Sequence, residues 1–93
     1  MRVLVHLYGD LRQALSQKEM VAYLKKGTTL EGLLHHLAKK LERRAGDEGA
    51  GLQRIMGGNV ILVNGRHHNF TGGLKTVLVE DTVVDVIPPL LGG

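Results

Sequence analysis

The chain has no cysteine and no tryptophan, and its aromatic residues are limited to Tyr8, Tyr23 and Phe70. The lack of cysteine excludes disulfides, thiol nucleophiles and cysteine-ligated metal sites, and it is compatible with a reducing cytoplasm. Proteins that bind single-stranded nucleic acid stack bases on aromatic side chains, so the scarcity of aromatic residues argues against a nucleic-acid partner. We therefore expect a cytoplasmic protein that does not bind nucleic acid.

Long apolar runs are also missing. No segment approaches the roughly 18 apolar residues that a membrane-spanning helix needs, and the start of the chain leads directly into a short alternating segment rather than a secretory signal. We expect no contact with membranes. The chain has 93 residues, is 43% hydrophobic and carries a net charge of +3, which predicts one small domain with a single core.

The first part of the chain shows alternating hydrophobicity. Residues 2–8 predict a strand whose odd-numbered side chains share one face. Residues 9–10 predict a turn, and residues 11–18 are ambiguous, with room for one helical turn. Residues 19–24 predict a second strand, antiparallel to the first because consecutive strands with short connections are usually neighbours.

One amphipathic helix is the clearest element of the sequence, and we expect it over residues 29–44. Thr28 and Glu31 have the spacing of a capping box, which predicts Thr28 as the N-cap. One continuous apolar stripe follows at helical spacing, formed by Leu30, Leu33, Leu34, Leu37, Ala38 and Leu41. This stripe predicts that the helix covers one face of a sheet.

The second half of the chain predicts a loop and more strands. Residues 45–58 contain several glycines and predict a surface loop, with a turn of helix near residues 52–56. Residues 60–63 are apolar on both faces, as in a central strand. Asn64-Gly65 is a strong hairpin signal, and residues 66–70 predict the return strand.

The last strand is expected over residues 82–87, after a break at residues 71–73 and a crossing segment at residues 74–79. Pro88-Pro89 ends it, because proline cannot donate a hydrogen bond to the sheet. One helix stripe covers one sheet face, so the fold class is α+β in two layers. We expect a globular domain over residues 1–87 and an extended tail over residues 88–93.

Histidines and glycines give no convincing enzyme site. The adjacent pairs His35-His36 and His67-His68 point in different directions on a helix or a strand, so we expect no metal site. The segment 71–76 lacks the spacing of a phosphate-binding loop. The basic dipeptides at 39–40 and 43–44 fit a solvated helix face better than an anion site.

The C-terminal residues are the most informative. Two prolines and two leucines precede Gly92-Gly93. A tail without side chains can enter a narrow tunnel because glycine allows close approach of the surrounding backbone. Its terminal carboxylate becomes a good electrophile as an anhydride with AMP, open to a sulfur or amine nucleophile. The alternative is an inert, frayed terminus.

These residues resemble the MoaD/ThiS group of ubiquitin-like β-grasp sulfur carriers, with MoaD, the molybdopterin synthase small subunit, as the nearest member. The similar segments are residues 7–12, 28–34, 60–65 with the ending Val-Asn-Gly, 80–83, and 87–93 with the ending Pro-Pro-Leu-Leu-Gly-Gly. The resemblance implies a β-grasp fold, with the first and last strands parallel at the centre of a mixed sheet.

The resemblance also implies a function. A ubiquitin-activating-type (MoaB-like) enzyme would use ATP and magnesium to adenylate Gly93, and a persulfide donor would convert the adenylate into a thiocarboxylate. The carrier, not catalytic alone and without a permanent cofactor, would pass sulfur to an acceptor such as the large subunit of molybdopterin synthase. Gly92 would permit threading, and Pro88, Pro89, Leu90 and Leu91 would line the tunnel.

Two departures from the family pattern leave other pathways open. Leu90-Leu91 stands where the family more often has Val-Ala, and the loop 45–58 is glycine-rich. The alternatives are a carrier for thiamine synthesis or tRNA thiolation, and a protein modifier joined to lysines through Gly93.

The sheet face opposite the helix is the expected docking surface for partner enzymes. Leu4, Tyr8 and Ile87 should lie there, because they alternate with the residues of the presumed core. An apolar patch on a small carrier predicts a binding site. The alternative is a sheet face that is simply partly apolar.

Overall fold

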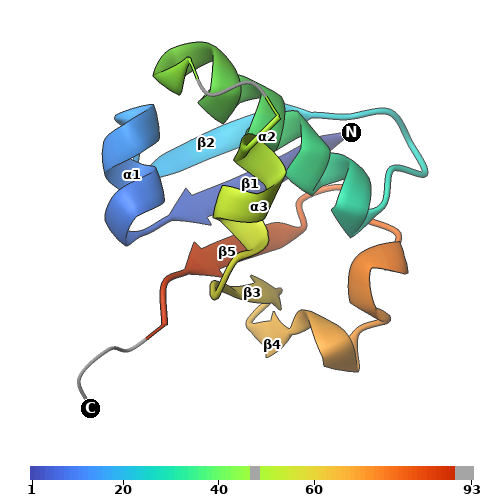
Figure 1. Cartoon of the computed structure of the whole chain (residues 1–93). Coiled ribbons are helices and arrows are strands. Elements are labelled where there is room, and N and C mark those ends of the chain that lie inside the picture. Colours follow the sequence, from blue (N-terminus) through green and yellow to red (C-terminus); the bar gives the residue numbers. More distant parts are fainter. Residues whose placement is uncertain (47–48, 90–93) are drawn as a thin grey trace.

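The computed structural model describes residues 1–46 and 49–89. It contains a mixed five-stranded sheet in the order β2-β1-β5-β3-β4, with the helices lying on one side (Figure 1). The α+β architecture expected from the helix stripe is confirmed. The elements, in chain order, are β1 (Arg2–Leu7), α1 (Gly9–Leu15), β2 (Glu19–Tyr23), α2 (Leu30–Ala45), α3 (Gly51–Met56), β3 (Val60–Val63), β4 (Arg66–His67), the 3-10 turns η1 (His68–Phe70) and η2 (Gly73–Lys75), and β5 (Val83–Ile87).

The first and last strands form the centre of the sheet. β1 runs parallel to β5, with Leu4 opposite Val83 and His6 opposite Asp85. β2 lies antiparallel to β1, and β3 lies antiparallel to β5. Both the parallel pairing and the antiparallel first hairpin were predicted, and both are confirmed.

The core lies between the sheet and α2. The odd-numbered residues of β1 and the even-numbered residues of β5 are buried, as the alternation predicts. The apolar stripe of α2 packs onto them, which explains why this helix is long and continuous. The fully buried side chains of this layer include Val3, Val5, Leu7, Leu30, Leu33, Leu34, Leu37, Leu41, Val84 and Val86.

The predicted N-cap of α2 is wrong by one residue. Thr29 is the cap, and its hydroxyl oxygen accepts a hydrogen bond from the backbone N–H of Gly32 at 3.2 Å. Thr28 instead donates from its hydroxyl to the carbonyl of Lys25 at 2.6 Å, within the preceding turn. The cause is tertiary. A β-bridge between Thr29 and Val77 keeps the chain extended up to residue 29.

Other boundaries also differ from the prediction. The segment expected to be a turn and a connection is the helix α1, because Leu11 and Leu15 lie one turn apart and are both buried. The return strand is limited to β4, and the chain then turns into η1, where His68 Nδ1 lies 3.2 Å from the carbonyl oxygen of Ile61. The helical turn expected within the loop is present as α3.

The hairpin between β3 and β4 is confirmed. Asn64 and Gly65 have φ values of 50° and 82°, the left-handed pair that a type I′ turn requires. The Asn64 side chain accepts a hydrogen bond from the backbone N–H of Val83 at 2.8 Å, which ties the hairpin to β5. Among the described residues, none of the helices is both long and apolar enough to span a membrane.

The two adjacent threonines allow a matched test of the cap. Thr29→Ala should lower the free energy of unfolding by about 1 kcal/mol, because it leaves a helix N–H without a partner. Thr28→Ala should have a smaller effect, because the turn carbonyl it releases can bind water. Urea denaturation of both variants measures the difference. An equal or larger loss for Thr28→Ala would contradict the assignment.

Candidate functional site

The base of the C-terminal tail rests on a glycine. β5 ends at Ile87, and the next residue, Pro88, packs against Gly9, which begins α1 after β1. A Cβ atom at Gly9 would lie 2.9 Å from Cγ of Pro88, and Gly9 has a φ of +58°. Two reasons therefore favour glycine at this position: its left-handed backbone conformation and the close approach of the proline ring.

A second junction lies near the next proline. A Cβ atom at Gly58 would lie 3.9 Å from Cγ of Pro89. The Asn59 side chain donates to the carbonyls of Arg54 and Ile55 at 3.3 and 2.6 Å and so closes the end of α3. Pro88 thus packs against the start of α1, and Pro89 lies near the residues that follow α3.

An ion pair joins these two helices. Arg54 donates from Nε and Nη2 to one carboxylate oxygen of Asp10, at 3.1 and 2.8 Å. We call Gly9, Asp10, Arg54 and Gly58 the tail platform. The tail platform lies beside the point where the chain leaves the end of β5 (Figure 1).

The open face of the sheet carries a polar cluster, formed by His6, Tyr8, Glu19 and Asp85. Asp85 Oδ1 lies 2.9 Å from His6 Nδ1 and accepts a hydrogen bond from the Tyr8 hydroxyl at 3.1 Å. His6 Nε2 lies 3.6 Å from a carboxylate oxygen of Glu19. The Asp85 side chain is only 14% exposed. Its partners are His6 of β1 and Tyr8, which directly follows β1, and Glu19 of β2 joins the cluster through His6.

The hydrogen bond to Asp85 raises the pKa of Tyr8 above its usual value, with smaller contributions from partial burial and the carboxylate charge. The Tyr8 hydroxyl therefore stays protonated and donates a hydrogen bond to Asp85. Because Tyr8 is also the N-cap residue of α1, this bond orients the residue that precedes Gly9. The polar cluster and the tail platform are thus adjacent along the chain.

The site residues predicted from the sequence comprise the docking residues of the open sheet face and the residues of the C-terminal tail. Leu4 and Ile87 are half-buried on the open face, and Tyr8 is 41% exposed. Pro88 is half-buried and Pro89 exposed. The remaining predicted residues, Leu90, Leu91, Gly92 and Gly93, lie outside the described residues, so their roles and the division at residue 88 stay predictions.

Sequence reasoning missed most of the polar cluster and the tail platform. The one local signal was Asp85, a charged residue in the otherwise apolar last strand. Nothing near Asp10 or Arg54 in the sequence indicates that they pair, because 44 residues separate them.

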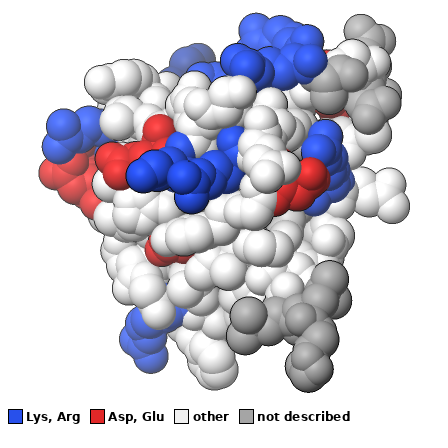
Figure 2. Space-filling model, turned by 90° about the vertical axis from the view of Figure 1, so that its left-hand side faces the viewer, with Lys and Arg blue, Asp and Glu red and all other residues white. Residues whose placement is uncertain are grey.

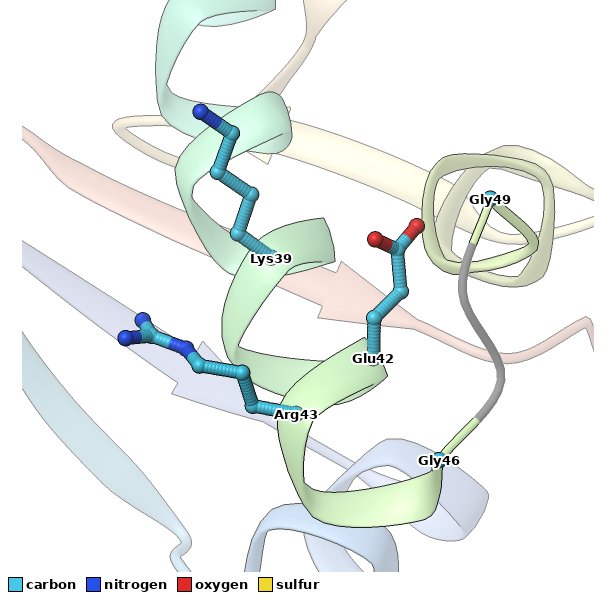
Figure 3. A pocket seen from close by; sticks show the side chains of 5 residues that line it. All are labelled: Lys39, Glu42, Arg43, Gly46 and Gly49. Carbon is cyan, nitrogen blue, oxygen red and sulfur yellow. The ribbon is translucent and has the colours of Figure 1, made fainter.

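A hollow of about 950 Å³ lies beside the end of α2 (Figure 3). Its carboxylate, Glu42, points toward α3 and accepts a hydrogen bond from the backbone N–H of Gly51 at 2.9 Å, while Lys39 and Arg43 point away from it. The Glu42 carboxylate thus binds the first residue of α3. Within residues 1–46 and 49–89, no group of three or more histidine, aspartate or glutamate residues could hold a metal ion.

Gly9→Ala tests the tail platform. The substitution should destabilise the protein by about 1–2 kcal/mol through the left-handed backbone and should also displace Pro88. Gly27→Ala is the matched control, because Gly27 has a φ of +91° and nothing lies within 4 Å of its Cβ position. NMR shifts of Pro88 should change in the first variant only. Unchanged Pro88 signals in Gly9→Ala would refute the contact.

Titration of Tyr8 tests the polar cluster. With Tyr23→Phe as background, tyrosinate absorbance should report a Tyr8 pKa above the ordinary value of about 10. Asp85→Asn should lower this pKa, whereas Asp81→Asn should not. The raised pKa contributes stability that is present below about pH 10 and is lost as pH rises through the folded-state pKa. An unchanged pKa in Asp85→Asn would exclude the proposed cause.

Comparison with known proteins gives the family. The ThiS family profile matches residues 5–93. A Pyrococcus furiosus protein assigned as molybdopterin converting factor subunit 1 is 25% identical, with a TM-score of 0.73 over 97% of this chain and 99% of that chain. Small archaeal modifier protein 1 of Methanosarcina acetivorans is 26% identical, with a TM-score of 0.74 over 99% and 96%.

A chain in the complex of subunits 1 and 2 of the molybdopterin-converting factor of Helicobacter pylori has the same fold, at 22% identity and a TM-score of 0.58. The match covers 100% of this chain and 100% of that chain. No curated protein sequence matches significantly. The β-grasp fold implied by the sequence is confirmed. With a family profile that covers almost its whole length, the chain belongs to the ThiS family of small ubiquitin-like sulfur carriers and protein modifiers.

Proposed function

We propose that this protein is a sulfur carrier whose terminal residue, Gly93, is adenylated and then converted to a thiocarboxylate. The observation that carries the proposal is the match of the ThiS profile through residue 93. The tail platform supports it, because Pro88 packs against Gly9 where the chain leaves the central strand.

The chemistry has three steps. A carboxylate oxygen of Gly93 attacks the α-phosphorus of ATP, and pyrophosphate leaves. The terminal sulfur of a persulfide attacks the acyl carbon, and AMP leaves, which gives an acyl disulfide. A second thiol then cleaves the S–S bond, which releases the thiocarboxylate and leaves the two thiols joined as a disulfide. Partner enzymes supply the ATP, the magnesium, the persulfide and the thiol.

Each tail residue has a role in this scheme. Gly93 carries the sulfur, and Gly92 lets the backbone of the partner approach closely. Leu90 and Leu91 fill the apolar entrance of the partner tunnel. The preceding prolines restrict the backbone, so less conformational entropy is lost when the tail is inserted.

The open sheet face is the proposed docking surface. Leu4, Tyr8 and Ile87 contact the adenylating enzyme and the sulfur acceptor, and the hydrogen bond to Asp85 fixes the Tyr8 ring. Partly apolar surface with one oriented polar group is typical of interface centres. The partners would be a ubiquitin-activating-type enzyme and an acceptor enzyme.

Molybdopterin synthesis is the pathway we favour. The Pyrococcus furiosus relative is assigned to that pathway at 25% identity, and the Helicobacter pylori structure contains subunit 1 together with subunit 2. The acceptor would then be the large subunit of molybdopterin synthase. Thiamine synthesis and tRNA thiolation use the same carrier chemistry and remain alternatives.

One comparison favours a second function. The modifier protein of Methanosarcina acetivorans is as similar as the molybdopterin relative. The adenylate of Gly93 could be attacked by a lysine amine instead of a sulfur, which would form an isopeptide bond and release AMP. The same platform and docking surface would serve both reactions.

Mass spectrometry tests the carrier function. The protein is incubated with a cognate adenylating enzyme, ATP, magnesium and a persulfide-generating enzyme. The terminal peptide should gain the mass that replaces one oxygen with sulfur. Deletion of Gly93 and the substitution Gly92→Val should abolish the gain, whereas Gly27→Ala, which lies in the turn before α2, should not.

The alternatives give different products. A modifier leaves Gly-Gly remnants on target lysines after proteolysis in cells that express a tagged chain. Adenylation without thiocarboxylate formation by any sulfur donor, together with such remnants, would replace the carrier function with the modifier function. No adenylation by several enzymes of the cognate class would refute both.

A further inference from the structure

β2 is an edge strand with one free side. Among residues 1–46 and 49–89, it stands last in the sheet order and pairs only with β1. Leu7 donates to the carbonyl of Lys18 at 2.7 Å, and Leu24 donates to the carbonyl of Met1 at 2.8 Å. Hydrogen-bonded pairs alternate along an antiparallel ladder, so the even-numbered residues of β2 bond to β1 and the odd-numbered residues point their backbone groups outward.

Three residues thus present unpaired backbone groups at this edge. Glu19, Val21 and Tyr23 are exposed, and no backbone hydrogen bond to them is present in the described part of the chain. β2 contains neither proline nor glycine. Such an edge is a template for an additional strand.

A basic groove runs beside the edge, on the side of the sheet that the helices cover. It encloses about 230 Å³ and is lined by Leu15, Gln17 and Met20 on one side and by Lys40, Arg43 and Arg44 of α2 on the other. Within residues 1–46 and 49–89, no carboxylate forms a salt bridge with these three cations. Figure 2 shows Lys and Arg atoms gathered at the top of this side of the molecule, over the end of α2.

The charge of this groove also acts on a neighbouring histidine. Burial lowers the pKa of His36, and the nearby positive charges of Lys40, Arg43 and Lys39 lower it further. His36 is therefore neutral at neutral pH and leaves the cations as the charged groups of the groove.

We propose that the β2 edge binds an extended acidic segment of a partner protein as an additional strand. The backbone of the segment pairs with Glu19, Val21 and Tyr23. Because side chains alternate along a strand, every second side chain enters the basic groove and is acidic there. The others lie on the open face beside Val21 and Tyr23 and are apolar.

A second copy of this chain fits the edge less well. In an antiparallel pairing centred on Val21, Met20 and Ala22 of the copy would stay buried in its own core. The groove cations of the copy, Lys40, Arg43 and Arg44, would lie on the same side of the extended sheet as those of the first molecule, so the pairing brings like charges to one side. The groove therefore favours a foreign acidic strand over self-association.

The inference does not depend on the chemistry of the tail. β1 separates β2 from β5, the strand that leads to the tail platform. A partner can therefore be held at the β2 edge while the tail and the platform remain accessible to an enzyme. The edge would serve as an anchoring site for proteins that recognise the carrier without reacting with it.

Amide hydrogen exchange on the full chain tests the proposal. The probe is a short acetylated and amidated peptide that alternates glutamate and valine. The amides of Glu19, Val21 and Tyr23 should exchange rapidly in the free protein and become protected with the peptide, while Met20 and Ala22 are protected in both states. A peptide with the same residues grouped by type, and one with lysine in place of glutamate, should not protect them.

Variants separate the two parts of the site. Lys40→Glu combined with Arg43→Glu should weaken peptide binding at least about tenfold, whereas Arg66→Glu combined with Lys75→Glu, on the other side of the molecule, should have little effect. Val21→Pro should abolish binding, and the sheet should tolerate it because the Val21 N–H points outward. The native NMR spectrum is the control for folding.

Three results would overturn the proposal. The first is an absence of binding at millimolar peptide. The second is binding that leaves the amides of Glu19, Val21 and Tyr23 unprotected. The third is protection of these amides in the protein alone, with dimerisation seen by sedimentation, because a second copy would then occupy the edge.

Discussion

The packing of the leucine stripe of α2 against the valines of β1 and β5 is the interaction on which the rest of the structure depends. Each fully buried leucine contributes about 1.5–3 kcal/mol, and the stripe contains Leu33, Leu37 and Leu41 among its members. In a chain of this size no other layer can replace it. It requires β1 and β5 to lie side by side, so the first and last strands are neighbours at the centre of the sheet.

This constraint places Pro88, the first residue after β5. Because β5 is central and parallel to β1, its last residue lies beside the first residues of α1, and Pro88 meets Gly9 there. The ion pair between Asp10 and Arg54 then joins the start of α1 to α3. The chain therefore leaves β5 beside the residues that join these two helices.

The same packing leaves the other face and one edge of the sheet open. Asp85 gathers His6 and Tyr8 at the middle of the open face, and the β2 edge lies beside the cations of α2. These surfaces differ in chemistry. The open face is partly apolar with an oriented tyrosine, and the edge is a backbone template beside positive charge.

The sequence by itself determined the helix, the strands and the face that each one buries, because helical and alternating periodicities depend on residues close together in the chain. It also indicated the hairpin at Asn64-Gly65 and, through its ending, the family. The tertiary structure decided where α2 begins, since the bridge between Thr29 and Val77 excludes Thr28 as the cap. It also decided the contacts of Gly9 with Pro88 and of His6 with Asp85, 79 residues apart in each case. Such contacts follow from strand order and register, which hydrophobic patterning restricts to one face but does not specify residue by residue.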